Sequence, residues 1–149
     1  MFSEYLRDTI PPSFYISKND IFAGHSIKFD RIKNFTENSE RYILLEHFDL
    51  IYECFYGKEV GPFSDAEYNG LATIDISRWK IIKIGLTSIL HYLNFGEDNN
   101  KYINYVYTKK TSKYIKKFRR EYIEMIQELI MWCDYSLYIL NDKVSIVGI

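Results

Sequence analysis

Residues 108–132 read TKKTSKYIKKFRREYIEMIQELIMW, and this stretch indicates how the chain folds. Apolar side chains recur in it every three or four positions, which predicts a long amphipathic helix with one face in the core. The apolar face carries Ile115, Phe118, Tyr122, Ile126, Leu129 and Cys133. A helix of this length needs other elements to cover that face, so the chain is expected to build a helix-rich core.

The charges of this stretch oppose the helix dipole. Cations come first, and Glu121, Glu124 and Glu128 follow them. A helix is stabilised by the reverse order, with carboxylates at its N-terminus and cations at its C-terminus. The order therefore suggests that something besides local helix stability places the cations, which are Lys109, Lys110, Lys113, Lys116, Lys117, Arg119 and Arg120.

Two further helices are predicted upstream. Residues 40–56 place Leu44, Phe48 and Phe55 on one side at helical spacing, and Gly57 is suited to end the helix. Residues 77–95 bury Trp79 and Ile82 in the same way, with Gly96 as the stop. Two alternatives stay open: 79–84 also suits a strand, and 102–107 suits either a strand or a helix.

Short strands are expected near both ends of the chain. Residues 14–17 and 27–29 are aromatic or β-branched and lie between turn-forming residues. Residues 135–140 and 144–147, separated by Asn141-Asp142, predict a C-terminal β-hairpin. The fold class that follows is α+β, with about three helices supplying most of the core of one domain over residues 1–149.

Length and composition indicate a protein that folds without disulfides. The chain has 149 residues, the size of one domain, and 17% of them are aromatic. Cys54 and Cys133 lie far apart with no paired spacing, which favours buried thiols in a reducing compartment. No secretory signal and no apolar run of ~20 residues is found, so a cytoplasmic protein without a membrane partner is expected.

No pattern in the sequence specifies a reaction. His25, His47 and His91 are scattered, and spacing gives none of them the partner that a general base needs. Phosphate-binding loops, nucleophile elbows and paired zinc ligands are all missing from the sequence. We therefore predict no catalytic residues, no metal, no cofactor and no enzymatic activity.

The first candidate binding surface is acidic. On the predicted helix 40–56, the side opposite the apolar face carries acidic and aromatic residues at offsets of three and four, which form one row. Tyrosines anchor protein interfaces and carboxylates steer basic partners. The predicted row consists of Tyr42, Glu46, Asp49, Glu53 and Tyr56, continued in the next loop by Glu59, Asp65 and Glu67.

The second candidate surface is the basic segment 109–120, in which Tyr114 and Phe118 alternate with cations. Cations that contact phosphates and rings that stack on bases are typical of nucleic-acid binding. The net charge of −1 argues for an ordinary solvated helix end instead. The charge is unevenly spread: residues 1–75 hold 13 acidic and 7 basic side chains, and residues 76–149 hold 7 and 12.

In composition and size the chain is similar to small bacterial immunity proteins, which neutralise a cognate toxin. The resemblance implies a protein that neutralises a toxin by binding it. The leading hypothesis is therefore a protein that covers a basic toxin, such as a nuclease domain, and acts by occlusion. The acidic row, which comes from the helical spacing, is its expected contact surface. Two other hypotheses stay open. One is a nucleic-acid-binding protein that uses 109–120, and the other is a compact viral interaction protein of the helical-bundle type.

Overall fold

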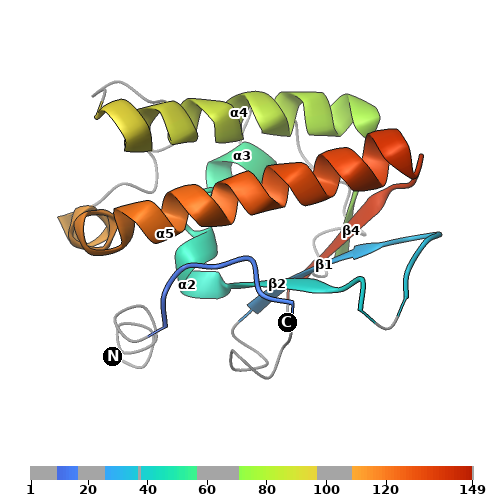
Figure 1. Ribbon diagram of the computed structural model, residues 1–149, viewed down its shortest axis with the longest axis horizontal. Coiled ribbons are helices and arrows are strands. Elements are labelled where there is room, and N and C mark those ends of the chain that lie inside the picture. The colour runs from blue at the N-terminus through green and yellow to red at the C-terminus, as the bar shows by residue number, and fades with distance from the viewer. Residues whose placement is uncertain (1–9, 17–25, 37, 57–70, 97–108, 149) are drawn as a thin grey trace.

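The computed structural model describes residues 10–16, 26–36, 38–56, 71–96 and 109–148. A four-stranded sheet forms one layer, and two long helices cover one of its faces (Figure 1). The predicted α+β class is therefore confirmed. The ambiguous segment 102–107 lies outside the described residues.

The sheet is antiparallel throughout, with the strand order β2-β1-β4-β3. The predicted strand at 27–29 is part of β1 (Ser26–Arg31), which pairs with both β2 (Arg41–Leu44) and β4 (Val144–Gly148). The fourth strand, β3 (Leu71–Ile74), pairs with β4. Of the predicted strand at 14–17, Tyr15 forms a bridge to Tyr42 on the edge of β2.

Alternation along the strands defines an inner face that the helices cover. Phe29 lies opposite both Arg41 and Ile146, and Arg31 lies opposite Val144. Since side chains alternate between faces, these inner positions form one surface. Its apolar members, all fully or nearly fully buried, are Ile27, Phe29, Ile43, Ala72, Ile74, Val144 and Ile146.

The first long helix, α4 (Ile76–Phe95), confirms the helical interpretation of 77–95 and excludes the strand alternative. Its N-cap is Asp75, whose carboxylate accepts a hydrogen bond from the Arg78 N–H at 2.9 Å. It ends at Gly96, which takes a left-handed conformation with φ of 67°. Trp79, Ile82, Leu86, Ile89 and Leu93 face the core.

The second long helix, α5 (Lys109–Asp134), is the amphipathic helix that the opening stretch predicts. It is kinked at Phe118, whose φ and ψ of −119° and 26° are not helical, and its first part turns away from its long axis (Figure 1). Past Asp134 it continues as a π-helix, η3 (Tyr135–Ile139). Arg119 donates a hydrogen bond to the Leu93 carbonyl oxygen at 2.6 Å, so this cation caps the end of α4.

The prediction of one helix over 40–56 is wrong. The segment instead forms β2, then α2 (Leu45–Phe48), a turn, and α3 (Tyr52–Tyr56). Pairing with β1 overrides the helical spacing, because Tyr42, Ile43 and Leu44 are all buried, on both faces of the sheet. The expected amphipathic helix would bury one stripe at helical spacing, whereas a strand covered on both faces buries consecutive side chains.

The prediction of a C-terminal hairpin is wrong for its first strand, residues 135–140. Residues 144–147 do form a strand, but it pairs with β1 and β3, and residues 135–139 extend the helix. Ser136 and Leu137 are buried in that extension, so continuing the helix keeps its apolar face on the core. The chain then reverses at Asn141, whose φ is 51°.

Buried Asp142 fixes this reversal against the end of β1. Its carboxylate accepts hydrogen bonds from the backbone N–H groups of Lys33, Asn34 and Lys143, at 3.0, 2.7 and 2.7 Å, and from the Asn34 amide. Burial alone raises the pKa of Asp142, but these donors outweigh it and hold the pKa below its ordinary value. The ionised carboxylate thus stabilises the folded chain.

We predict that Asp142→Asn destabilises the protein at neutral pH by roughly 2–3 kcal/mol, since it removes a charged acceptor of several N–H groups. Because the pKa is depressed in the folded state, the stabilisation is present above about pH 4 and is lost as the pH falls through the folded-state value. Urea unfolding of both proteins from pH 7 to pH 2.5 checks this. A wild-type advantage that does not shrink below pH 4 would contradict it.

Candidate functional site

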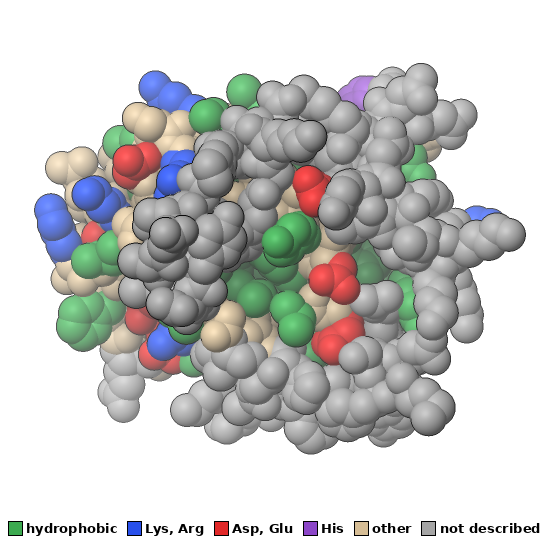
Figure 2. Space-filling view, turned by 180° about the vertical axis from the view of Figure 1, so that it is seen from behind, with side chains coloured by type: hydrophobic (Ala, Val, Ile, Leu, Met, Phe, Trp, Pro, Cys, Tyr) green, Lys and Arg blue, Asp and Glu red, His purple; other side chains and the backbone are tan. Residues whose placement is uncertain are grey.

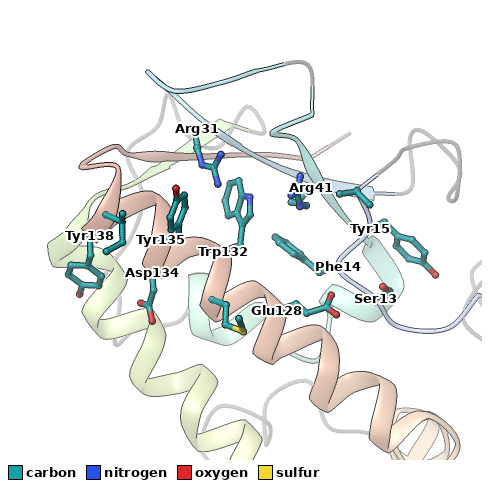
Figure 3. A pocket seen from close by; sticks show the side chains of 13 residues that line it. Ser13, Phe14, Tyr15, Arg31, Arg41, Glu128, Trp132, Asp134, Tyr135 and Tyr138 are labelled. Carbon is teal, nitrogen blue, oxygen red and sulfur yellow. The ribbon is translucent and has the colours of Figure 1, made fainter.

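A groove of about 930 Å³ lies between the C-terminal part of α5 with η3, the segment 13–16, and strands β1 and β2 (Figure 3). Its volume falls within the range of natural ligand pockets, roughly 300–1,000 Å³. The groove is lined by Ser13, Phe14, Tyr15, Ile16, Arg31, Arg41, Glu128, Met131, Trp132, Asp134, Tyr135, Tyr138 and Ile139.

Two arginines form the wall on the sheet side of the groove. Arg31 and Arg41 are the charged residues at inner positions of the four described strands, where every other side chain is apolar or is Gly148. They are diagonal neighbours across the β1–β2 pair, a relation that places residues about 7–8 Å apart. The apolar inner face of the sheet thus ends in a pair of cations.

Arg31 is held in place from three directions. Its Nε donates a hydrogen bond to Ser136 Oγ at 2.8 Å, and Ser136 Oγ donates to the Trp132 carbonyl oxygen at 2.8 Å. The guanidinium lies 5.1 Å from the ring centroid of Trp132 and 5.6 Å from that of Tyr135, within the range of cation–π attraction. The Arg31 side chain, carried by β1, is therefore held in one orientation at the groove by residues of α5 and η3.

Arg41 is half-buried beside it. Its Nη1 donates to the carbonyl oxygens of Asn38 and Glu40, at 2.7 and 2.9 Å. Burial, followed by the positive charge of Arg31, lowers the pKa of Arg41 from its ordinary value, and Asp30 partly opposes this. The two guanidinium groups are therefore close enough to repel each other.

Aromatic rings line the groove next to the cations. Trp132 is 8% exposed and packs edge-on against Phe14, with ring centroids 5.8 Å apart. Its indole N–H is buried and has no hydrogen-bond partner among the described residues. A buried donor without a partner costs about 1–3 kcal/mol, and such groups in native proteins often mark a binding or strained site.

The helix side of the groove carries two carboxylates, on the opposite side from the arginines (Figure 3). Asp134 accepts hydrogen bonds from Trp79 Nε1 and from Lys83 Nζ, both at 2.8 Å, so its charge is compensated by α4. Glu128 is exposed. The groove is therefore cationic along the sheet and weakly acidic along the helix.

Large apolar side chains along this groove are exposed. Met131 is 71% exposed, Ile139 69% and Ile16 67%, while Tyr135 and Tyr138 are nearly half exposed. Single exposed apolar residues are ordinary, but a contiguous group with a polar rim typically marks an interaction site. The π-helix contributes to the group, and π-helical turns frequently occur at functional sites.

The predicted acidic row does not form one surface. Tyr42 lies on β2 with 3% exposure, and its hydroxyl donates to Glu40; burial and this bond raise the pKa of Tyr42 to about 12. Glu46 is buried, while Asp49 is exposed and Glu53 partly so. The Tyr56 side chain and residues Glu59, Asp65 and Glu67 lie outside the described part.

The face opposite to that of Figure 1 shows acidic side chains beside hydrophobic ones (Figure 2).

The basic segment is divided in its roles. Lys116, Lys117 and Arg120 are exposed, whereas Arg119 caps α4. Arg120 forms an exposed ion pair with Glu124 at 3.2 Å. The side chains of Lys109, Lys110 and Lys113 lie outside the described part. A continuous cationic surface over 109–120 therefore stays a prediction.

His47, Cys54 and Cys133 are buried, whereas His91 is exposed on α4. His47 is fully buried: its Nε2 lies 2.5 Å from the Ile10 carbonyl oxygen, and its Nδ1 lies 2.8 Å from the Tyr122 hydroxyl. Because a carbonyl only accepts, Nε2 carries a proton and donates a hydrogen bond to Ile10. Cys54 and Cys133 are free, buried thiols, and burial raises the pKa of both. His47, Cys54 and Cys133 are therefore part of the buried interior.

Sequence reasoning missed the groove. One signal was present: alternation in 27–31 places Arg31 on the same side as Ile27 and Phe29, a cation in an apolar register. Arg41 and the aromatic residues of η3 give no comparable signal in the sequence. The pattern predicts a helix at Arg41, where the structure has a strand, and a strand over 135–140, where it has a π-helix. Their convergence depends on strand pairing across most of the chain.

The comparisons with known proteins add no relative: no protein family, no curated protein and no solved structure matches the chain. Among the described residues, no helix is long and apolar enough to cross a membrane.

We predict that the exposed apolar residues of the groove contribute little to folding. Met131→Ser and Ile139→Ser should each change the free energy of unfolding by less than about 0.5 kcal/mol. Leu137→Ala, at a fully buried position between them, should cost about 2–5 kcal/mol. Urea unfolding of the three variants checks this, and a loss above about 2 kcal/mol for either serine variant would show that the position belongs to the core.

Proposed function

We propose that this protein is a non-enzymatic protein-binding module and that its partner docks in the groove between η3, the C-terminal part of α5 and the segment 13–16. The observation that carries the proposal is the exposed apolar group in the groove, above all Met131, Ile139 and Ile16. Folding does not bury these side chains, and a partner would. Burying apolar surface is the main driving force of protein association.

The composition of the groove supports a protein partner. Interface cores are enriched in Trp, Tyr, Met and Arg, and all four residue types line this groove. Two of its walls come from strands and from a helix, which hold their shape before binding and so reduce the entropy lost on association. Burial of His47, Cys54 and Cys133 leaves these residues without access to a substrate, in keeping with a non-enzymatic role.

The biological form that we propose is that of an immunity-type protein, which blocks a toxin domain by occlusion in the cytoplasm. The size and aromatic composition of the chain support it, and its two free thiols suit a reducing compartment. Of the predicted acidic surface, Asp49 and Glu53 remain as described, accessible contacts for a basic partner. The groove offers a larger and more apolar surface than these two residues.

Affinity capture from the native host with four tagged proteins tests the docking surface. The groove variant carries Met131→Ser and Ile139→Ser, the acidic variant Asp49→Lys and Glu53→Lys, and the basic variant Lys116→Glu, Lys117→Glu and Arg120→Glu. We expect a stoichiometric protein partner of wild type that the groove variant loses at least tenfold. The other two variants should retain it.

Retention of the partner by the groove variant, with loss by the acidic variant, would move the docking surface to α2 and α3. Nucleic acid that wild type retains at low salt and the basic variant loses would instead establish a nucleic-acid-binding protein, with affinity that falls steeply with salt. Circular dichroism of each variant confirms that it is folded before its binding is judged.

A further inference from the structure

The two arginines at the end of the inner sheet face are only partly compensated in charge. Neither Arg31 nor Arg41 forms an ion pair with a carboxylate in the part of the chain that the structure describes, although the charge of Asp30 acts on Arg41, and both line the groove. Cations that remain unpaired at the base of an apolar surface are costly to cover with apolar atoms alone. Whatever fills the groove therefore has to supply an anion there.

We propose that the groove recognises a carboxylate that adjoins an aromatic or aliphatic group, with the carboxylate between Arg31 and Arg41 and the apolar group against Trp132, Met131 and Tyr135. The source to which we commit is an acidic side chain of the protein partner, next to a large apolar residue. This inference rests on the proposed function, because it assigns the chemistry of the anchor that the same groove takes.

Repulsion between the two cations favours an anion. Burial and then the charge of Arg31 lower the pKa of Arg41, while Asp30 opposes this, so part of the strain on Arg41 comes from the second cation. A carboxylate placed between the two guanidinium groups adds an attraction to each of them, which offsets their repulsion. Guanidinium groups also match the planar geometry of a carboxylate with paired N–H donors.

The indole N–H of Trp132 gives independent support. It is a buried donor without an acceptor, and the drawn indole nitrogen lies on the side of the ring toward Arg41 (Figure 3). Because the atom is covered, an acceptor reaches it only when a neighbouring side chain of the wall moves aside. A carboxylate has two oxygens and four acceptor sites, so it can accept from the indole as well as from the arginines.

The rest of the groove orients the ligand. On the α5 side, the Asp134 charge is compensated by Lys83, and exposed Glu128 repels a second anion. The rings of Tyr135 and Tyr138 lie along the π-helix, away from the strand that carries Arg41 (Figure 3). Met131, on α5, lines the groove with them. The groove therefore suits a single anion with its apolar body on the helix side.

A matched pair of fluorescent probes tests this chemistry on the whole protein. The anionic probe 8-anilinonaphthalene-1-sulfonate has an aromatic body and one sulfonate in place of the carboxylate. The neutral probe N-phenyl-1-naphthylamine has the same body without the charge. We expect both to bind wild type, and Arg31→Gln with Arg41→Gln to weaken the anionic probe by about tenfold, while changing the neutral probe less than twofold.

Control variants separate the anion site from folding and from general charge effects. Arg31→Lys with Arg41→Lys keeps both cations and should retain most of the affinity for the anionic probe. Lys28→Gln removes one cation from the outer face of the same strand and should leave both probes unchanged. Glu128→Gln should leave anionic binding unchanged or tighten it. The captured partner should displace the anionic probe from wild type.

The outcomes separate this inference from the proposed function. The anion site is overturned if Arg31→Gln with Arg41→Gln binds both probes as wild type does. It is also overturned if Lys28→Gln lowers the affinity for the anionic probe as much as the double variant does. In both cases the apolar groove stands. If neither probe binds folded wild type, the groove itself is overturned, and the proposed function fails with it.

Discussion

The packing of Phe29 on the central strand β1 is the contact on which the rest of the structure depends. Its fully buried ring lies 5.6 Å from Phe14, 6.4 Å from Phe48 and 6.0 Å from Phe55, measured between centroids. These partners come from the N-terminal segment, α2 and α3, so one side chain joins three separate parts of the chain to the sheet. Phe14 continues the network to Trp132 at the edge of the groove. The core and the proposed binding surface are thus one aromatic cluster.

The groove begins where that cluster meets the charged end of the sheet. Two residues beyond Phe29, the same face of β1 carries Arg31, which cannot be buried among apolar atoms without compensation. The end of α5 and the π-helix supply part of it through the rings of Trp132 and Tyr135 and through Ser136, and they leave Met131 and Ile139 exposed. A site built in this way is held by the core, but its own apolar residues add little to stability.

Much of the helical layer could be predicted from the sequence, and much of the rest could not. The apolar spacing of α4 and α5 and the stop at Gly96 depend on local geometry, which a sequence displays directly. The prediction of one helix over 40–56 was wrong because helical spacing and strand pairing compete there, and pairing with β1 is a long-range effect. The groove was missed for the same reason. Arg31 and Trp132 are 101 positions apart in the chain and meet only through the fold.

On this structure the groove, rather than either charged surface, is proposed to contact the partner. Amide hydrogen exchange of the protein, alone and with its captured partner, distinguishes these surfaces, because burial against a partner slows exchange at the contact. We expect slower exchange in 13–16 and 131–139, with 49–53 and 116–120 unchanged. Slowing confined to 49–53 or to 116–120, with the groove exchanging as in the unbound protein, would contradict it.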